Sequence, residues 1–130
     1  MDADLWNVRE DLEVESGKRS PLRLRCMVDS GSTQTVLPLS VADQLDLPRR
    51  LSPLRVTYGD GRTETRQVAT GLFMRIMGRF TETTAIVEPG RETVLVGAFP
   101  LEDMGFNVDL EHGTLVPYPG TEAGQCAVIE

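Results

Sequence analysis

The turn Asp29-Ser30-Gly31 lies between two apolar segments, and this arrangement constrains the fold more than any other part of the sequence. Before the turn, apolar side chains alternate with other residues along positions 22–28, which is the period of a half-buried β-strand. After it comes the apolar run Thr35-Val36-Leu37. Serine can hydrogen-bond the local backbone, and glycine permits close approach of the chain. The sequence therefore predicts a tight turn that holds Asp29 at the end of a strand.

A carboxylate held in this way is a candidate catalytic group. Two carboxylates that share one proton can cleave a peptide bond, because one acts as general base for water while the other donates to the carbonyl oxygen. The chain offers one such turn, so the second carboxylate would come from another copy of the chain. By ordinary residue frequencies, about one chain in thirty of this length contains Asp-Ser-Gly by chance, usually as a surface turn. The apolar chain on both sides of Asp29 favours the catalytic interpretation.

Two motifs carry a resemblance to a known family. The segment from Val28 to Leu37 resembles the active-site motif of the retropepsin-like single-lobe aspartic proteases, in which an apolar residue, Asp, Ser or Thr and Gly precede a small residue, two variable positions and Thr-Val-Leu. The apolar run and glycine at 94–97, followed by residues 100–105, resemble the family's second motif and the short helix after it. Together the motifs cover about residues 22–117, and the chain is identified as a prokaryotic-type member.

The chain departs from the family pattern at two places. Ser30 stands where many members have threonine, which is a known variant. Ala98-Phe99 stands where many bacterial members carry a variable residue and an aspartate. We expect this departure to affect the local geometry of the helix and not the catalytic residue.

The resemblance implies an aspartic endopeptidase that acts as a symmetric homodimer on peptide or protein substrates, with no metal and no other cofactor. Asp29 and its copy would form the catalytic pair, and Ser30 and Gly31 would hold the carboxylates through hydrogen bonds. The resemblance further implies two groups of substrate-binding residues: Ser32, Thr33 and Gln34 along the cleft, and Tyr58, Gly59, Asp60 and Gly61 above it.

The dipeptide Asp60-Gly61 separates two alternating segments and predicts a β-hairpin at residues 54–65. Its residues alone indicate an ordinary connection between core strands. By the resemblance, this hairpin is instead the flap that closes over the substrate, excludes water and approaches the ligand through its glycines. Tyr58, which precedes a glycine, is similar to the flap tyrosine of pepsin-type relatives.

The predicted fold is all-β: a closed or partly closed barrel or β-sandwich with the flap hairpin and one or two short helices, in one domain over residues 1–117. Strands are expected within residues 5–16, 68–77, 80–87 and 93–96, and a last hairpin within 106–116. Ser40 and Asp43 predict a short helix ended by Pro48, and Pro100 and Gly105 bracket another. The tail, 118–130, begins irregularly, and its end is either a strand of the dimer interface or disordered.

Several other reactive residues have simpler interpretations. Asp109 lacks a following Ser-Gly or Thr-Gly, so we assign it to an exposed strand face or edge, and we place Glu102 and Asp103 in the first turn of a helix, where acids are favoured. His112 is predicted in a solvated turn. Cys26 is expected in the core, and the two cysteines, Cys26 and Cys126, do not suggest a disulfide framework. Trp6 is either a core residue or part of a dimer contact.

Composition excludes further classes of protein. With 130 residues and a hydrophobic share of 40 %, one small domain is expected. The net charge of −7 argues against a surface for nucleic acid or anionic membranes. No apolar run approaches the roughly 20 residues of a membrane span. The acidic N-terminus is unlike a secretory signal, so we expect a cytoplasmic protein or a fragment of a longer one.

Two alternatives to a free-standing enzyme are compatible with these residues. One is a catalytically silent dimeric module that binds peptides or partners with the same fold, and such a module should tolerate Asp29→Asn. The other is a protease domain that becomes active only after release from a precursor.

Overall fold

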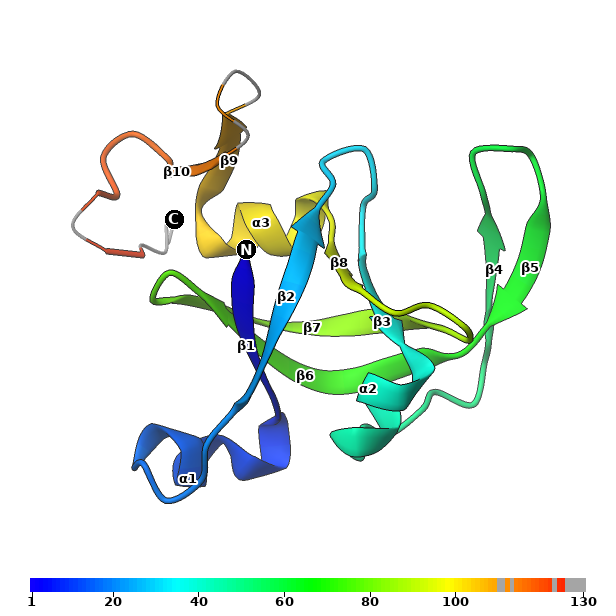
Figure 1. Ribbon diagram of the computed structural model, residues 1–130, viewed down its shortest axis with the longest axis horizontal. Helices are drawn as coiled ribbons and strands as arrows, with labels where there is room; N and C mark the ends of the chain where they lie inside the picture. The colour runs from blue at the N-terminus through cyan, green and yellow to red at the C-terminus, as the bar shows by residue number, and fades with distance from the viewer. Residues whose placement is uncertain (110–111, 113, 123, 126–130) are drawn as a thin grey trace, which may run out of the picture.

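The computed structural model describes residues 1–109, 112, 114–122 and 124–125. Six of its strands close into a barrel in the order β1-β2-β8-β3-β7-β6 (Figure 1). The barrel strands are β1 (Asp2–Asn7), β2 (Leu22–Val28), β3 (Thr35–Pro38), β6 (Val68–Ile76), β7 (Arg79–Glu88) and β8 (Val94–Val96). The all-β prediction is confirmed.

Two hairpins and three short α-helices complete the described fold. The hairpins are β4 (Leu54–Thr57) with β5 (Thr63–Arg66), and β9 (Phe106–Asp109) with β10 (Thr114–Pro117). The helices are α1 (Asp11–Glu15), α2 (Leu39–Gln44) and α3 (Ala98–Met104). Figure 1 shows the β4–β5 hairpin on one side of the barrel and α3 with β9 on the other, while the loop after β2 lies between them. None of the helices in the described residues is long and apolar enough to cross a membrane.

Aliphatic side chains fill the barrel, as the aromatic share of only 5 % requires. Leu5, Leu37, Leu72, Met74 and Ile76 are fully buried there. Cys26 lies in the same core, as predicted, and burial raises the pKa of its thiol.

Trp6 is buried on the outer face of β1, outside this aliphatic core. Its ring stacks on Phe73 at 5.5 Å between ring centroids, and its indole N–H donates to Asp11 at 3.0 Å. Of the two roles expected for Trp6, the structure confirms a buried core position, here stacked on Phe73 and outside the aliphatic cluster of the barrel.

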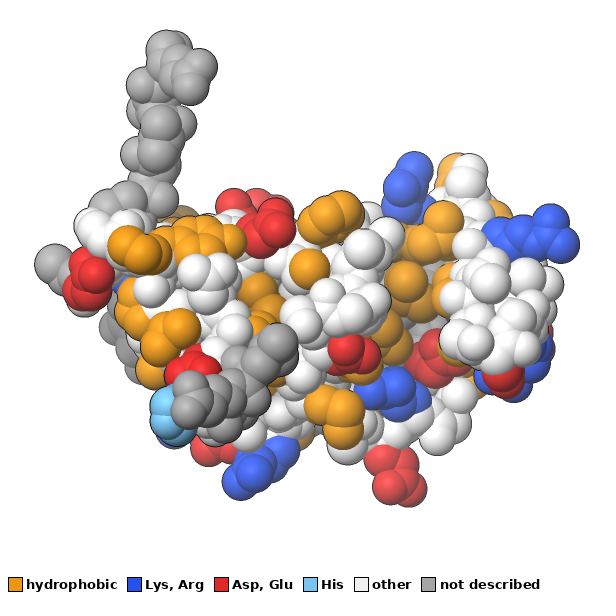
Figure 2. Space-filling model, turned by 90° about the horizontal axis from the view of Figure 1, so that it is seen from above, with side chains coloured by type: hydrophobic (Ala, Val, Ile, Leu, Met, Phe, Trp, Pro, Cys, Tyr) orange, Lys and Arg blue, Asp and Glu red, His pale blue; other side chains and the backbone are white. Residues whose placement is uncertain are grey.

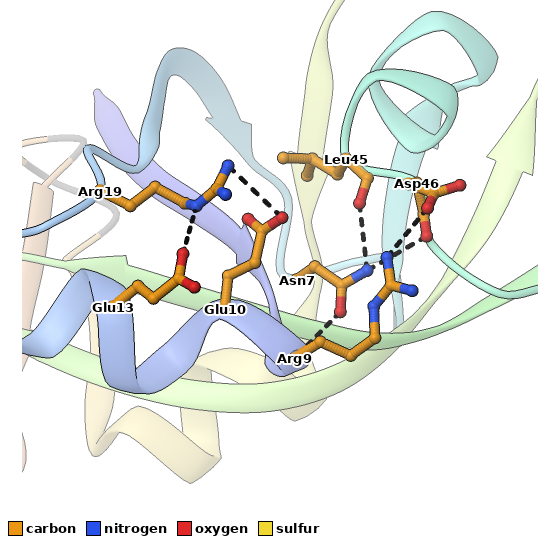
Figure 3. A network of polar contacts seen from close by, with 7 residues as sticks. All are labelled: Asn7, Arg9, Glu10, Glu13, Arg19, Leu45 and Asp46. Atoms are coloured by element: carbon orange, nitrogen blue, oxygen red, sulfur yellow. Dashed lines mark hydrogen bonds and ion pairs between the residues drawn. The ribbon is translucent and has the colours of Figure 1, made fainter.

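The prediction of a strand within residues 5–16 is wrong beyond Asn7. A 3-10 turn (Val8–Glu10) and α1 follow β1 directly, so the described residues contain three α-helices where one or two were expected. The side chain of Asn7 accepts a hydrogen bond from the Arg9 amide and donates to the carbonyl oxygens of Leu45 and Asp46 (Figure 3). The side-chain amide of Asn7 is buried, and it finds these hydrogen-bond partners when the chain turns after Asn7. The strand therefore ends here. Leu12, assigned to the strand by its spacing, is 84 % exposed.

Two helix starts also differ from the prediction. Helix α2 begins at Leu39, and no side chain caps it, so Ser40 is not the N-cap. Helix α3 begins directly after Gly97, which places Glu102 and Asp103 beyond its first turn. Asp103 instead accepts a hydrogen bond from the buried Thr81 hydroxyl at 2.5 Å, which gives this carboxylate a structural role.

The remaining predicted strands are confirmed. Met77 and Gly78, both with positive φ, make the tight turn between β6 and β7. His112 is exposed in the turn between β9 and β10, with its Nδ1 2.7 Å from a carboxylate oxygen of Asp109 on β9. In the tail, the side-chain amide of Gln125 bonds both backbone groups of Phe80. The strand expected at the end of the tail falls at 126–129, outside the described residues.

Candidate active site

Backbone hydrogen bonds hold Asp29 where β2 ends. β2 runs parallel to β8, with Val28 opposite Val96, and the amide of Asp29 continues the ladder by donating to the Val96 carbonyl at 3.0 Å. The chain then turns, because the Gly31 amide donates to Oδ1 of Asp29 at 2.9 Å and the Ser32 amide donates to the Asp29 carbonyl at 3.1 Å. The carboxylate is thus fixed in orientation although it is exposed to solvent.

Gly97 brings the second sequence motif against the first. A Cβ atom at this position would lie 2.5 Å from the carbonyl oxygen of Gln34, 2.6 Å from its nitrogen and 2.7 Å from the carbonyl oxygen of Ser32. Such distances leave no room for a side chain, so glycine is required by close backbone approach.

The first backbone amides of α3 hydrogen-bond to the chain after Asp29 across this short distance. The Ala98 amide donates to the Ser32 carbonyl at 2.7 Å, and the Phe99 amide donates to the Thr33 carbonyl at 2.9 Å. Both bonds are made by backbone groups, so the unusual side chains at 98 and 99 do not prevent the helix from supporting the Asp29 turn.

A cleft of about 410 Å³ lies between the Asp29 turn and the β4–β5 hairpin. The predicted site residues that line it are Asp29, Gly31, Ser32, Thr33, Gln34, Tyr58 and Gly59. Figure 2 views the molecule from above and shows hydrophobic side chains gathered in the hollow beside the hairpin.

Three of the predicted site residues lie elsewhere. Ser30 lines a separate pocket of about 200 Å³, together with residues of α3 and β9. Asp60 and Gly61 form the exposed tip of the hairpin, where Asp60 accepts a hydrogen bond from the Arg62 amide at 2.9 Å and Gly61 has a φ of 84°. The cleft therefore lies between the Asp29 turn and the start of the hairpin loop at Tyr58 and Gly59. The tip of the hairpin lies outside the cleft.

A family model described as aspartyl protease matches residues 12–99, about two thirds of the chain. The chain belongs to the retropepsin-like aspartyl protease family. The matched residues include the Asp29 turn, the β4–β5 hairpin and the run from Val94 to Gly97, so the resemblance seen in the sequence is confirmed. No curated protein matches the chain significantly.

In this member of the aspartyl protease family, the cleft has an apolar floor that the sequence analysis did not identify. Val36 on β3 pairs with Ile86 on β7 and with Leu95 on β8, and all three side chains line the cleft. The alternate residues of the same strands, such as Leu37 and Val87, face the barrel core. The sequence did contain a signal for this floor: the strands are apolar on both faces, but only one face of each strand can pack against the barrel core.

Glu88 is a carboxylate that links the hairpin to the barrel. It lies at the end of β7 and accepts hydrogen bonds from the Tyr58 hydroxyl and, at 3.1 Å, from Nε of Arg66. Burial raises the pKa of Tyr58, and the Glu88 carboxylate raises it further. The guanidinium of Arg62 stacks 4.5 Å from the centre of the tyrosine ring. Sequence analysis missed Glu88 because its partners lie far away in the chain.

Over the described residues, no group of three or more His, Cys, Asp or Glu side chains is placed to hold a metal ion.

Proposed function

We propose that this protein is an aspartic endopeptidase in which Asp29 and Asp29 of a second copy activate water across a homodimer. The observation that carries the proposal is an exposed carboxylate, oriented by the Gly31 amide, at the side of a cleft with an apolar floor. No cation of the described residues lies within 4.0 Å of the Asp29 carboxylate, so it is available to a substrate or to a second carboxylate.

The second carboxylate must be supplied by another chain. Glu88 is the other carboxylate that lines the cleft, but it is occupied by Tyr58 and Arg66. A residue near a two-fold axis meets its own copy in a symmetric dimer. An exposed Asp29 at the end of a strand can satisfy this condition.

The surface beside Ser30 supports such a dimer. Ser30 opens toward the pocket formed with α3 and β9, and two exposed apolar side chains lie on the neighbouring elements. Phe99 on α3 is 61 % exposed, and Val116 on β10 is 40 % exposed. Burying these side chains against a second copy would be favourable, and it would bring the two Asp29 turns together.

Hydrolysis would then follow from one proton shared by two carboxylates. Like charges held close together cannot both ionise easily, so one carboxyl stays protonated while the other is ionised; aspartic proteases are the standard example. The ionised group removes a proton from water as the water attacks the peptide carbonyl carbon. The protonated group donates to the carbonyl oxygen, which gives a tetrahedral intermediate. The carboxyl that took the proton from water then gives it to the amide nitrogen, while the other carboxylate takes back a proton from a hydroxyl of the intermediate, and the C–N bond breaks to leave an acid and an amine.

The β4–β5 hairpin would act as the flap. Tyr58 and Gly59 lie on the far side of the cleft from Asp29, so a bound peptide would pass between them and the turn. Ser32, Thr33 and Gln34 would contact the peptide backbone, while Val36, Val56, Ile86 and Leu95 would contact an apolar side chain.

Cleavage of a mixed peptide library between pH 3 and pH 8 tests the proposal, with the oligomeric state of each protein measured by sedimentation. We expect a dimeric wild type that cleaves and a dimeric Asp29→Asn variant that does not. If both are dimers and neither cleaves, the chain is better described as a binding module with a protease fold. Cleavage by Asp29→Asn at the wild-type rate would exclude Asp29 from catalysis.

A further inference from the structure

The charged side chains that line the cleft are not equally available to a ligand. Besides Asp29, they are Glu88 and Arg91. Glu88 is neutralised by Arg66 at 3.1 Å and accepts the Tyr58 hydroxyl. Arg91 is half-buried, and its Nε donates to the Thr93 carbonyl at 2.7 Å. No carboxylate of the described residues lies within 4.0 Å of the Arg91 guanidinium, so this cation has no acidic partner in the described chain.

Arg91 lies at the end of the apolar floor that is remote from Asp29. Strand β3 runs from Thr35, next to the Asp29 turn, to Pro38, which pairs with Glu88. The loop that follows Glu88 carries Arg91 before the chain returns in β8. A four-residue strand spans on the order of 10 Å, the length of about three residues of an extended peptide.

We propose that Arg91 gives the cleft a preference for peptides that carry an Asp or Glu side chain about three residues from the bond that is cleaved. The proposal rests on the proposed function only in taking this cleft as the peptide site. A guanidinium binds a carboxylate through two parallel hydrogen bonds. The bond to Thr93 already orients the Arg91 side chain, so less conformational entropy is lost when a carboxylate binds.

The net charge of −7 opposes this preference only at long range. At physiological ionic strength charges are screened over about 8 Å, so the cation next to the bound peptide has the larger effect. Because Arg91 is partly exposed, we expect a moderate preference of about fivefold in Kd, within the range of partly exposed ion pairs.

The test is direct binding, measured by fluorescence anisotropy with the full-length Asp29→Asn protein, so that no peptide is cleaved. The probes are fluorescein-labelled peptides with an apolar centre and one Glu, Gln or Lys, moved through the three positions on each side. We expect one position at which Glu binds about fivefold more tightly than Gln. Arg91→Ala should abolish this ratio, and Arg91→Glu should shift the preference to Lys.

Arg50 supplies a matched control, because its side chain is exposed and does not line the cleft. Arg50→Ala and Arg50→Glu make the same changes in net charge and should leave the Glu to Gln ratio unaltered. A uniform change in all four variants would indicate a general effect of protein charge and would overturn the proposal. So would a Glu preference that survives in Arg91→Ala, or the absence of binding by every peptide.

Cleavage by the wild type separates this inference from the proposed function. If the wild type cleaves peptides but no binding preference depends on Arg91, the inference about Arg91 is wrong and the proposed function stands. If the preference depends on Arg91 but the wild type cleaves nothing between pH 3 and pH 8, the cleft binds acidic peptides and the proposed hydrolysis is wrong.

Discussion

The Asp29 turn and the β4–β5 hairpin form two sides of the same cleft, but different kinds of bonds hold them. Backbone amides of Asp29, Ala98 and Phe99 anchor the turn to β8 and α3. The hairpin is joined to β7 through side chains that meet at Glu88. Backbone bonds within a packed core do not titrate in the ordinary range and open rarely, whereas side-chain bonds can exchange with water. We therefore expect the turn to hold the Asp29 carboxylate in place and the hairpin to be the more mobile of the two.

The largest expected effect is the loss of kcat in Asp29→Asn. Asp60→Asn in the hairpin is the matched control. Both carboxylates accept a backbone N–H from two residues further on, at 2.9 Å in each case. Asparagine can accept the same bond but cannot act as a base, so kcat should fall by about 10³-fold or more for Asp29→Asn. Asp60→Asn should lower kcat by at most about fivefold. Comparable losses in the two variants would contradict the division between turn and hairpin.

Two glycines test the same division through stability. Gly97→Ala would place a methyl group within 2.7 Å of three backbone atoms, so the free energy of unfolding should fall by about 3 kcal/mol, with loss of activity. Gly59→Ala is the matched control, since no atom lies within 4 Å of the position of its Cβ, and its cost should stay below about 0.5 kcal/mol. Urea unfolding monitored by circular dichroism measures both values. Equal costs would show that the turn tolerates displacement.

Tyr58→Phe removes one of the bonds that join the hairpin to Glu88. The hairpin should open more often, which we expect to raise KM about fivefold with a small effect on unfolding. Hydrogen exchange should be faster in residues 54–66 and unchanged in β2 and β8. The pKa of Tyr58 is raised in the folded protein. The contribution of the Tyr58 hydroxyl to stability is therefore complete below its ordinary pKa of 10.0 and is lost only as pH rises through the folded pKa. Unchanged exchange in residues 54–66 would mean that other contacts hold the hairpin.

The smallest expected effect is on the stability of the barrel at low pH. Asp4 is buried between Arg23 at 2.8 Å and Arg75 at 3.0 Å, and the hydrogen bond from Arg23 lowers its pKa below the ordinary 3.8. Its contribution to stability is therefore present above about pH 4 and is lost as pH falls through the folded pKa.

Asp4→Asn should cost less than about 1 kcal/mol at pH 7, because Arg23 is largely exposed. The cost should shrink toward pH 2 in urea unfolding curves. A cost that does not depend on pH would mean that packing, and not the carboxylate charge, accounts for it.

Much of the fold and the Asp29 turn could be predicted because their signals are local. Alternation predicts β2, two strand-like runs rich in β-branched residues predict β6 and β7, the apolar run predicts β8, and Asp60-Gly61 predicts the hairpin. The segment after Asn7 could not be predicted, because its turn depends on carbonyl groups of Leu45 and Asp46, far along the chain. Neither could the link through Glu88, whose partners lie on the hairpin.

The sequence by itself determined which residues are apolar, where the chain turns, and that one carboxylate ends a strand in the motif of a protease family. Only the tertiary structure decided which apolar residues face the core and which form the cleft floor, and that Ser30 faces away from that cleft. It also decided that Arg91 lines the cleft without an acidic partner among the described residues, while Glu88 is neutralised. The physical reason is that periodicity reports the composition of a strand's two faces, whereas barrel closure and strand order determine what covers each face.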